Sequence, residues 1–222
     1  MLINRDPYHF KEEVSSFQQE LCNLDLSVGA KDNFTSSFKH VLFMEFLYCS
    51  HPDLSHKKFV KSIIYDVLSS ILAIIQKRER YLYLNVRSMI EHIARIALQK
   101  IDNGGDFDIT VRSKDFELLK TNKPSENWIY LHQQYKQSCG WIHSSSNVGL
   151  NILSTFNELL TGDIKNSSLK QSIYLNKLTS EIVRVFYSYY ENEIKNIFMR
   201  KMDAMKYLVG KSNFTYFSIN FP

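Results

Sequence analysis

Residues 79–100, ERYLYLNVRSMIEHIARIALQK, read as one amphipathic helix. Their apolar positions recur every three or four residues, which at about 100° per residue places them on one arc of an α-helix. Arg87 and Glu91 lie beside this arc, four residues apart, so they can form an ion pair at the edge of the core. We expect a third polar side chain from another helix to join this pair. The arc that we expect to face the core comprises Leu82, Val86, Met89, Ile90, Ile93 and Ala97.

His143 is our candidate for the third group. It follows the apolar residues Trp141 and Ile142 and precedes three serines, so we expect it to be half-buried. A purely structural interpretation stays open, in which the histidine hydrogen-bonds Glu91 or a helix end and the pair of Arg87 with Glu91 only fixes the packing.

The rest of the chain predicts more helices and little else. Residues 107–111 resemble a short β-like stretch or an extended loop, and residues 213–221 alternate like a strand. Seven or so helices with short connections describe an all-α, antiparallel bundle with an irregular C-terminal tail. The periodicity indicates helices at about 8–25, 34–49 after a break at 28–30, 55–74 with Ser55 as N-cap, 113–122, 125–139, 148–162 and, as one helix or two, 168–208.

The composition limits the classes of protein. The 222 residues are 44% hydrophobic, with 7 Gly and 4 Pro, which favours a single folded domain of long helices, residues 1–222, over a disordered chain. The formal net charge of +4 permits contact with RNA without requiring it, since 23 acidic residues are mixed with 27 basic ones. Neither a signal peptide nor an apolar run that spans a bilayer is visible, so we expect a cytoplasmic protein with no membrane partner.

Several catalytic signatures are missing from the sequence. It contains no Gly-rich phosphate loop, no His-Glu-x-x-His, no Cys-x-x-Cys and no Gly-x-Ser-x-Gly, so we expect neither a metal nor a cofactor. Arginine, histidine and glutamate remain, and these residue types suit phosphodiester cleavage without a metal. A histidine near neutral pKa can take a proton from a ribose 2′-hydroxyl, and an arginine can meet the charge that develops on the phosphorane.

Two motifs resemble the HEPN superfamily. Arg87-Ser-Met-Ile-Glu-His92 is similar to its pattern of an arginine, four to six residues and a histidine. A branch of HEPN-like proteins carries an Arg-Ser-x-x-Glu helix and then a segment like Tyr-x-x-x-Ser-x-x-x-His-Ser; Tyr135, Ser138, His143 and Ser144 supply these residue types in this order. The resemblance covers about residues 60–160, within a HEPN-like core at about 55–208.

The resemblance implies a function and roles for these residues. HEPN proteins are helical bundles common in bacterial toxin–antitoxin, abortive-infection and CRISPR-linked defence, and their active members resemble RNases. It thus implies an antiviral-defence or toxin-type effector, a metal-independent endoribonuclease, acting as a homodimer or as a subunit of a defence complex. Two alternatives stay open: a non-catalytic protein-interaction module, and an antitoxin or immunity protein. The implied roles are His143 or His92 as general acid/base, Arg87 as phosphate contact, Glu91 as orienter, and Tyr135, Ser138 and Ser144 as substrate contacts.

His92 is the weaker of the two candidates for the general acid/base. Five residues on a helix turn through about 140°, so His92 lies far around the helix from Arg87, on the polar face with Asn85 and Arg95. We therefore expect His92 to face solvent or a second subunit.

Overall fold

The computed structural model describes residues 9–101, 110–143, 162 and 166–221. In this part of the chain nine helices and no strand occur, which confirms the all-α class. The helices are α1 (His9–Cys22), α2 (Val28–Ser50), α3 (Lys57–Ile75), α4 (Glu79–Ala97), α6 (Ser113–Asn122), α7 (Trp128–Ile142), α9 (Ser168–Tyr189), α10 (Glu191–Phe198) and α11 (Met202–Asn220).

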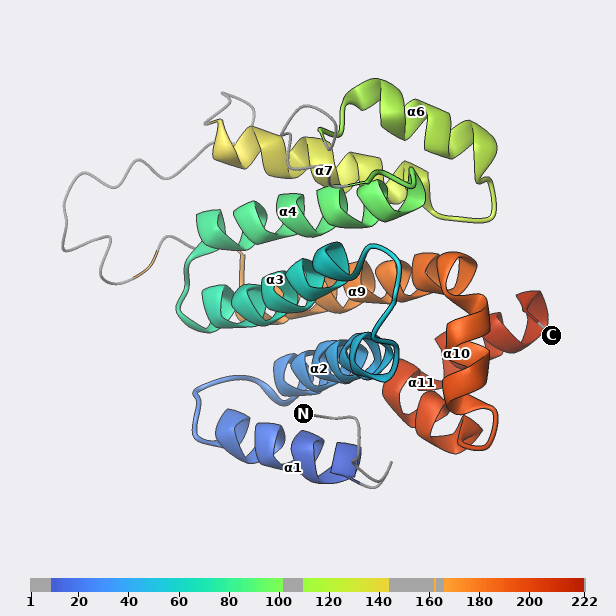
Figure 1. The fold of residues 1–222 in the computed structure, drawn as a ribbon. Coiled ribbons are helices and arrows are strands. Elements are labelled where there is room, and N and C mark those ends of the chain that lie inside the picture. The colour runs from blue at the N-terminus through green and yellow to red at the C-terminus, as the bar shows by residue number, and fades with distance from the viewer. Residues whose placement is uncertain (1–8, 102–109, 144–161, 163–165, 222) are drawn as a thin grey trace.

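The helices stack as layers around α3 and α9 (Figure 1). A tight connection, in which Lys77 takes a positive φ of 57°, folds α4 back onto α3 as an antiparallel hairpin. The opposite side of α4 packs against α7, which α6 covers, while α2 packs against α9 and α3 and is covered by α1. The short α10 and the longer α11 close one end of the stack (Figure 1).

The predicted core arc of α4 is confirmed. All six of its residues are buried, and they join a hydrophobic cluster that extends from Phe10 in α1 to Phe217 in α11. Burying one such side chain contributes roughly 1.5 to 3 kcal/mol, so the arc fixes the rotation of α4 about its own axis. That rotation turns the flank with Arg87 and Glu91 toward α7.

Three helix starts differ from the sequence-based expectation, and one of them is that of α7, which begins at Trp128 and not at residue 125. The predicted break at residues 28–30 is wrong because Ser27 caps α2, its Oγ accepting a hydrogen bond from the N–H of Ala30 at 3.3 Å. Ser55 is not the N-cap of α3, because His56 takes that position in the left-handed conformation. The predicted boundaries of α6, residues 113–122, agree with the structure.

The expected irregular, strand-like C-terminal tail is wrong, because α11 continues through it to Asn220. Asn213 and Phe217 lie one helical turn apart and are both buried, and the Phe217 ring packs edge-on against Tyr187 with centroids 4.8 Å apart. Aromatic residues in this segment satisfy a helical period as well as an alternating one, so contact with α9 decides the outcome. The helix expected at 148–162, apart from Gly162, and most of the stretch at 107–111 lie outside the described residues. None of the described helices is both long and apolar enough to cross a membrane.

Candidate functional site

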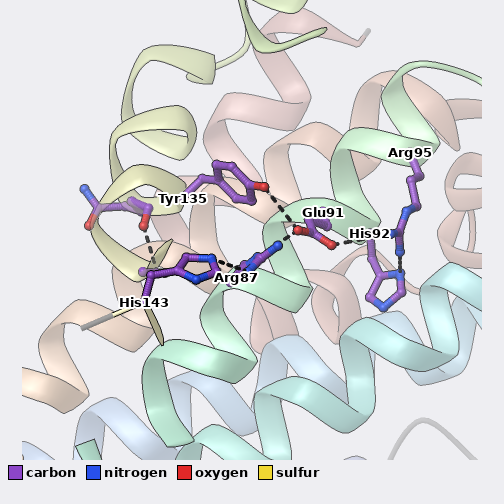
Figure 2. Close-up of polar contacts among 8 residues, drawn as sticks. Arg87, Glu91, His92, Arg95, Tyr135 and His143 are labelled. Carbon is purple, nitrogen blue, oxygen red and sulfur yellow. Dashed lines mark hydrogen bonds and ion pairs between the residues drawn. The ribbon is translucent and has the colours of Figure 1, made fainter. Parts of the chain in front are cut away.

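The carboxylate of Glu91 lies at the centre of a polar cluster between α4 and α7 (Figure 2). Its Oε1 accepts hydrogen bonds from Arg87 Nε at 2.9 Å and from the Tyr135 hydroxyl at 3.2 Å. Its Oε2 accepts one from Arg95 Nη2 at 3.4 Å. Three donors from two helices thus hold one half-buried carboxylate, which links α4 to α7 as well as fixing the side chains around it.

Arg87 is anchored on one side and open on the other. Its Nε binds Glu91, its guanidinium lies 5.8 Å from the centre of the Tyr135 ring, and its side chain keeps 30% of its surface exposed. Burial alone lowers the pKa of Arg87, but the hydrogen bond and charge of Glu91 outweigh it and raise the pKa above its ordinary value. The Arg87 guanidinium is therefore always charged, is held in one orientation by Glu91, and remains partly accessible to solvent.

His143 lies at the end of α7, which is held by two hydrogen bonds to its backbone and by one ring stack. Its N–H donates to the carbonyl of Cys139 at 2.9 Å, and Arg80 Nη2 donates to the carbonyl of Ile142 at 3.1 Å. Trp141 stacks on Tyr83 of α4 with ring centroids 4.6 Å apart. Because Trp141 is held in the interior, His143 is turned outward and is exposed. The expectation of a half-buried His143 is therefore wrong.

The structure brings Arg87 and His143 together. Arg87 Nη1 lies 3.5 Å from Nε2 of His143, a long contact in which the arginine is the donor and the imidazole nitrogen the acceptor (Figure 2). The described residues show no direct bond between Glu91 and His143, because Arg87, Tyr135 and Arg95 take up the carboxylate. Glu91 therefore orients Arg87 and not His143, which changes the role expected from the sequence.

His92 points away from this pair, toward α3 (Figure 2). Its ring stacks on Phe59 with centroids 5.7 Å apart, and its Nδ1 accepts from Arg95 Nη1 at 3.0 Å. Burial and the charges of Arg95 and Lys58 lower the pKa of His92 to about 4. His92 is thus a neutral histidine packed against α3, and its Nδ1 already accepts a hydrogen bond. The expectation that it faces solvent or a second subunit is not met.

The three expected substrate contacts have different outcomes. Tyr135 lies in the cluster, and burial together with the charge of Glu91 raises its pKa, so its hydroxyl stays protonated and donates. Ser138 has none of its surface exposed, and its hydroxyl donates to the carbonyl of Gln134 at 2.8 Å. Ser138 is thus out of reach of a substrate. Ser144 lies outside the described residues.

Two arginines of the site were not among the residues expected from the sequence. Arg95 follows Glu91 by four residues, as Glu91 follows Arg87, and this regular spacing on one helix face is a signal that the sequence contains. Arg80 reaches the carbonyl of Ile142 across 62 positions of sequence. No local pattern indicates such a contact.

The cluster offers a cation and an imidazole to one small group. Two nitrogens 3.5 Å apart, one on an exposed histidine and one on an arginine whose side chain is 30% exposed, can reach neighbouring oxygens of one anion such as a phosphodiester. Among the described residues no set of three or more His, Cys, Asp or Glu side chains is arranged to hold a metal ion. No protein family, curated protein or solved structure shows significant similarity to this chain. The HEPN resemblance therefore stays a prediction that rests on the two motifs.

Proposed function

We propose that the protein is a HEPN-type endoribonuclease in which His143 and Arg87 act together on one phosphodiester of RNA without a metal. The observation that supports this proposal is the 3.5 Å approach of Arg87 Nη1 to His143 Nε2 at an exposed edge between α4 and α7. One group of this pair accepts a proton and the other is a fixed cation, which are the two components that the reaction requires.

The chemistry follows from the atoms at this edge. When RNA binds, the long contact from Arg87 Nη1 to His143 Nε2 opens. The Nε2 lone pair then accepts the proton of a ribose 2′-hydroxyl, and the resulting oxyanion attacks the adjacent phosphorus. Arg87 donates from Nη1 to a non-bridging oxygen, where negative charge increases in the transition state. The 5′-oxygen leaves and takes a proton from water, and His143 returns its own proton to solvent, so the products are a 2′,3′-cyclic phosphate and a 5′-hydroxyl.

Glu91 and Tyr135 position the arginine in this mechanism. A free arginine side chain loses about 2 kcal/mol of rotamer entropy when it is fixed on a substrate. Glu91 already holds Arg87 Nε and is itself held by Tyr135 and Arg95, so most of this ordering is complete before RNA arrives. His92, packed against Phe59 with a pKa of about 4, is a poor base at neutral pH.

The biological context of the proposal comes from the motifs and not from the geometry. On that basis the chain is a bacterial antiviral-defence or toxin-type effector of the cytoplasm, assembled as a homodimer or within a defence complex. Expression of the wild type in a bacterial host is then expected to arrest growth, and His143→Ala is expected to relieve the arrest at equal levels of folded protein.

RNA cleavage by purified protein in the presence of EDTA tests the proposal. Loss of an acid/base group typically costs about two to four orders of magnitude in rate, so the cleavage rate of His143→Ala is expected to fall by that factor. His9→Ala is the matched control, since His9 is an exposed histidine on α1 that bonds to the nearby Glu12 at 3.0 Å. Cleavage that persists in a His143→Ala, His92→Ala double variant contradicts the proposal.

A non-catalytic interaction module is the second candidate. It is favoured by the way in which Glu91 binds Arg87, Arg95 and Tyr135, since a cluster that ties α4 to α7 has a structural use without any substrate. Under this alternative, RNA stays intact with the wild type, and substitutions in the cluster change only the free energy of unfolding.

A further inference from the structure

A second polar feature lies at the corner where α1 meets the turn between α10 and α11. A concavity of about 950 Å³ opens there. It lies well away from the Arg87–His143 pair, since α1 and the start of α11 are at the opposite side of the stack from α7 (Figure 1). Its charged lining comprises Lys11, Arg200, Lys201, Lys206, Lys211 and Asp203.

The charge of this corner is strongly one-sided. Five cationic side chains and one carboxylate line the concavity, and all five cations are exposed. Their excess of four positive charges equals the formal net charge of the entire chain, +4. The other charges of the chain therefore sum to zero. Such a concentration of like charge attracts a polyanion.

The wall of the concavity also carries apolar and aromatic surface. Met199 is 70% exposed and Met202 is partly exposed, and both belong to the lining together with Tyr207. Lys39 Nζ lies 4.0 Å from the centre of the Tyr207 ring and is a further cation next to the lining. Single-stranded nucleic acid has this same combination, a charged backbone with flat, apolar bases that stack on such side chains. A duplex would present mainly phosphates, and a flat membrane surface does not fit a hollow.

We propose that this basic concavity binds single-stranded RNA, with its lysines and arginine on the phosphates and its apolar wall against a base. This binding site goes beyond the proposed function, because it requires no cleavage and shares no residue with the Arg87–His143 pair. A second attachment point far from the reacting bond would increase the affinity for long strands relative to short ones.

Binding is measured with a fluorescent 2′-O-methyl oligoribonucleotide of about 12 nucleotides, a length within the range that single-strand-binding folds cover. This probe lacks the 2′-hydroxyl that the proposed reaction uses, so the full-length wild type binds it without cleaving it. Lys201→Gln combined with Lys206→Gln is expected to weaken binding roughly tenfold. The negative slope of log K against log salt should become shallower by about 1.4, or 0.7 for each phosphate that the variant no longer neutralises.

The matched control is Lys114→Gln combined with Lys170→Gln, which removes the same charge from exposed lysines on α6 and α9. Its affinity should stay close to that of the wild type. Equal losses of affinity in the two double variants would show a general charge effect and overturn the proposal. The proposal is also overturned if the wild-type protein does not bind the oligonucleotide but binds vesicles rich in phosphatidylserine or an acidic peptide. If RNA is bound here but never cleaved, the proposed function fails while this site stands.

Discussion

Removal of Glu91 should destabilise the protein more than removal of Arg87, although the two residues form one ion pair. The reason lies in the number of partners. When Arg87 is replaced by Ala, Glu91 keeps the Tyr135 hydroxyl at 3.2 Å and Arg95 at 3.4 Å. When Glu91 is replaced by Ala, Arg87 and Arg95 both lose the carboxylate that pairs with them, and the Tyr135 hydroxyl loses its acceptor.

The expected magnitudes follow from the burial of the pair. Breaking a fully buried ion pair costs about 3 to 5 kcal/mol, and an exposed pair contributes about 0.2 to 1 kcal/mol. The side chains of Arg87 and Glu91 are 30% and 20% exposed, between these limits, and the carboxylate retains partners. We therefore expect Arg87→Ala to lower the free energy of unfolding by about 1 to 2 kcal/mol and Glu91→Ala by about 2 to 4 kcal/mol.

Urea unfolding followed by circular dichroism measures the two free energies. A change of 1 kcal/mol shifts the thermal midpoint of a chain of this size by roughly 2 to 4 °C, so a thermal scan gives an independent reading. Glu117→Ala is the control, because Glu117 forms a comparable pair with Lys120 at 3.0 Å but is exposed, and little change is expected. A larger loss of stability for Arg87→Ala than for Glu91→Ala would refute the shared-carboxylate reasoning.

Two further predictions concern stability. Burial lowers the pKa of His40, which bonds Thr179 at 2.8 Å, to about 4 from an ordinary 6.5; its contribution is complete above pH 6.5 and is lost as pH falls toward 4. Urea unfolding at a series of pH values should show that the wild type loses about 3 kcal/mol more of its free energy of unfolding on acidification than His40→Gln does. Gly210 has φ 78° and ψ 164° inside α11, a conformation nearly restricted to glycine, so Gly210→Ala should lower the free energy of unfolding by about 1 to 3 kcal/mol. An unchanged urea midpoint for Gly210→Ala would show that the backbone at residue 210 can adopt another conformation without loss of stability.

Hydrophobic periodicity correctly predicts helices whose apolar face is buried in the core. The arc of α4 is correct because each of its residues gains from burial whatever it packs against. The C-terminal segment is different, because its aromatic residues fit a strand pattern and a helix pattern equally well. Phe217 packs on Tyr187, a residue 30 positions earlier, and no local pattern indicates such a contact.

The candidate site is predictable in part for the same reason. Arg87 and Glu91 pair because they lie four residues apart on one helix, which the sequence states directly. The exposure of His143 depends instead on the stack of Trp141 with Tyr83, a contact between two helices. Glu91 is already taken up by donors on α4 and α7, so the expected contact with His143 gives way to one between His143 and Arg87.

The central claim is that Arg87 and His143 act on the same phosphodiester, and a double-mutant cycle on the RNA cleavage rate tests it most directly. Groups that act as one unit show losses of rate that are far from additive. Arg87→Ala and His143→Ala should each reduce the rate in EDTA by at least about a hundredfold, and the double variant should cleave about as slowly as the slower single variant. Losses that multiply, or a folded His143→Ala protein that cleaves RNA at the wild-type rate, would contradict the account.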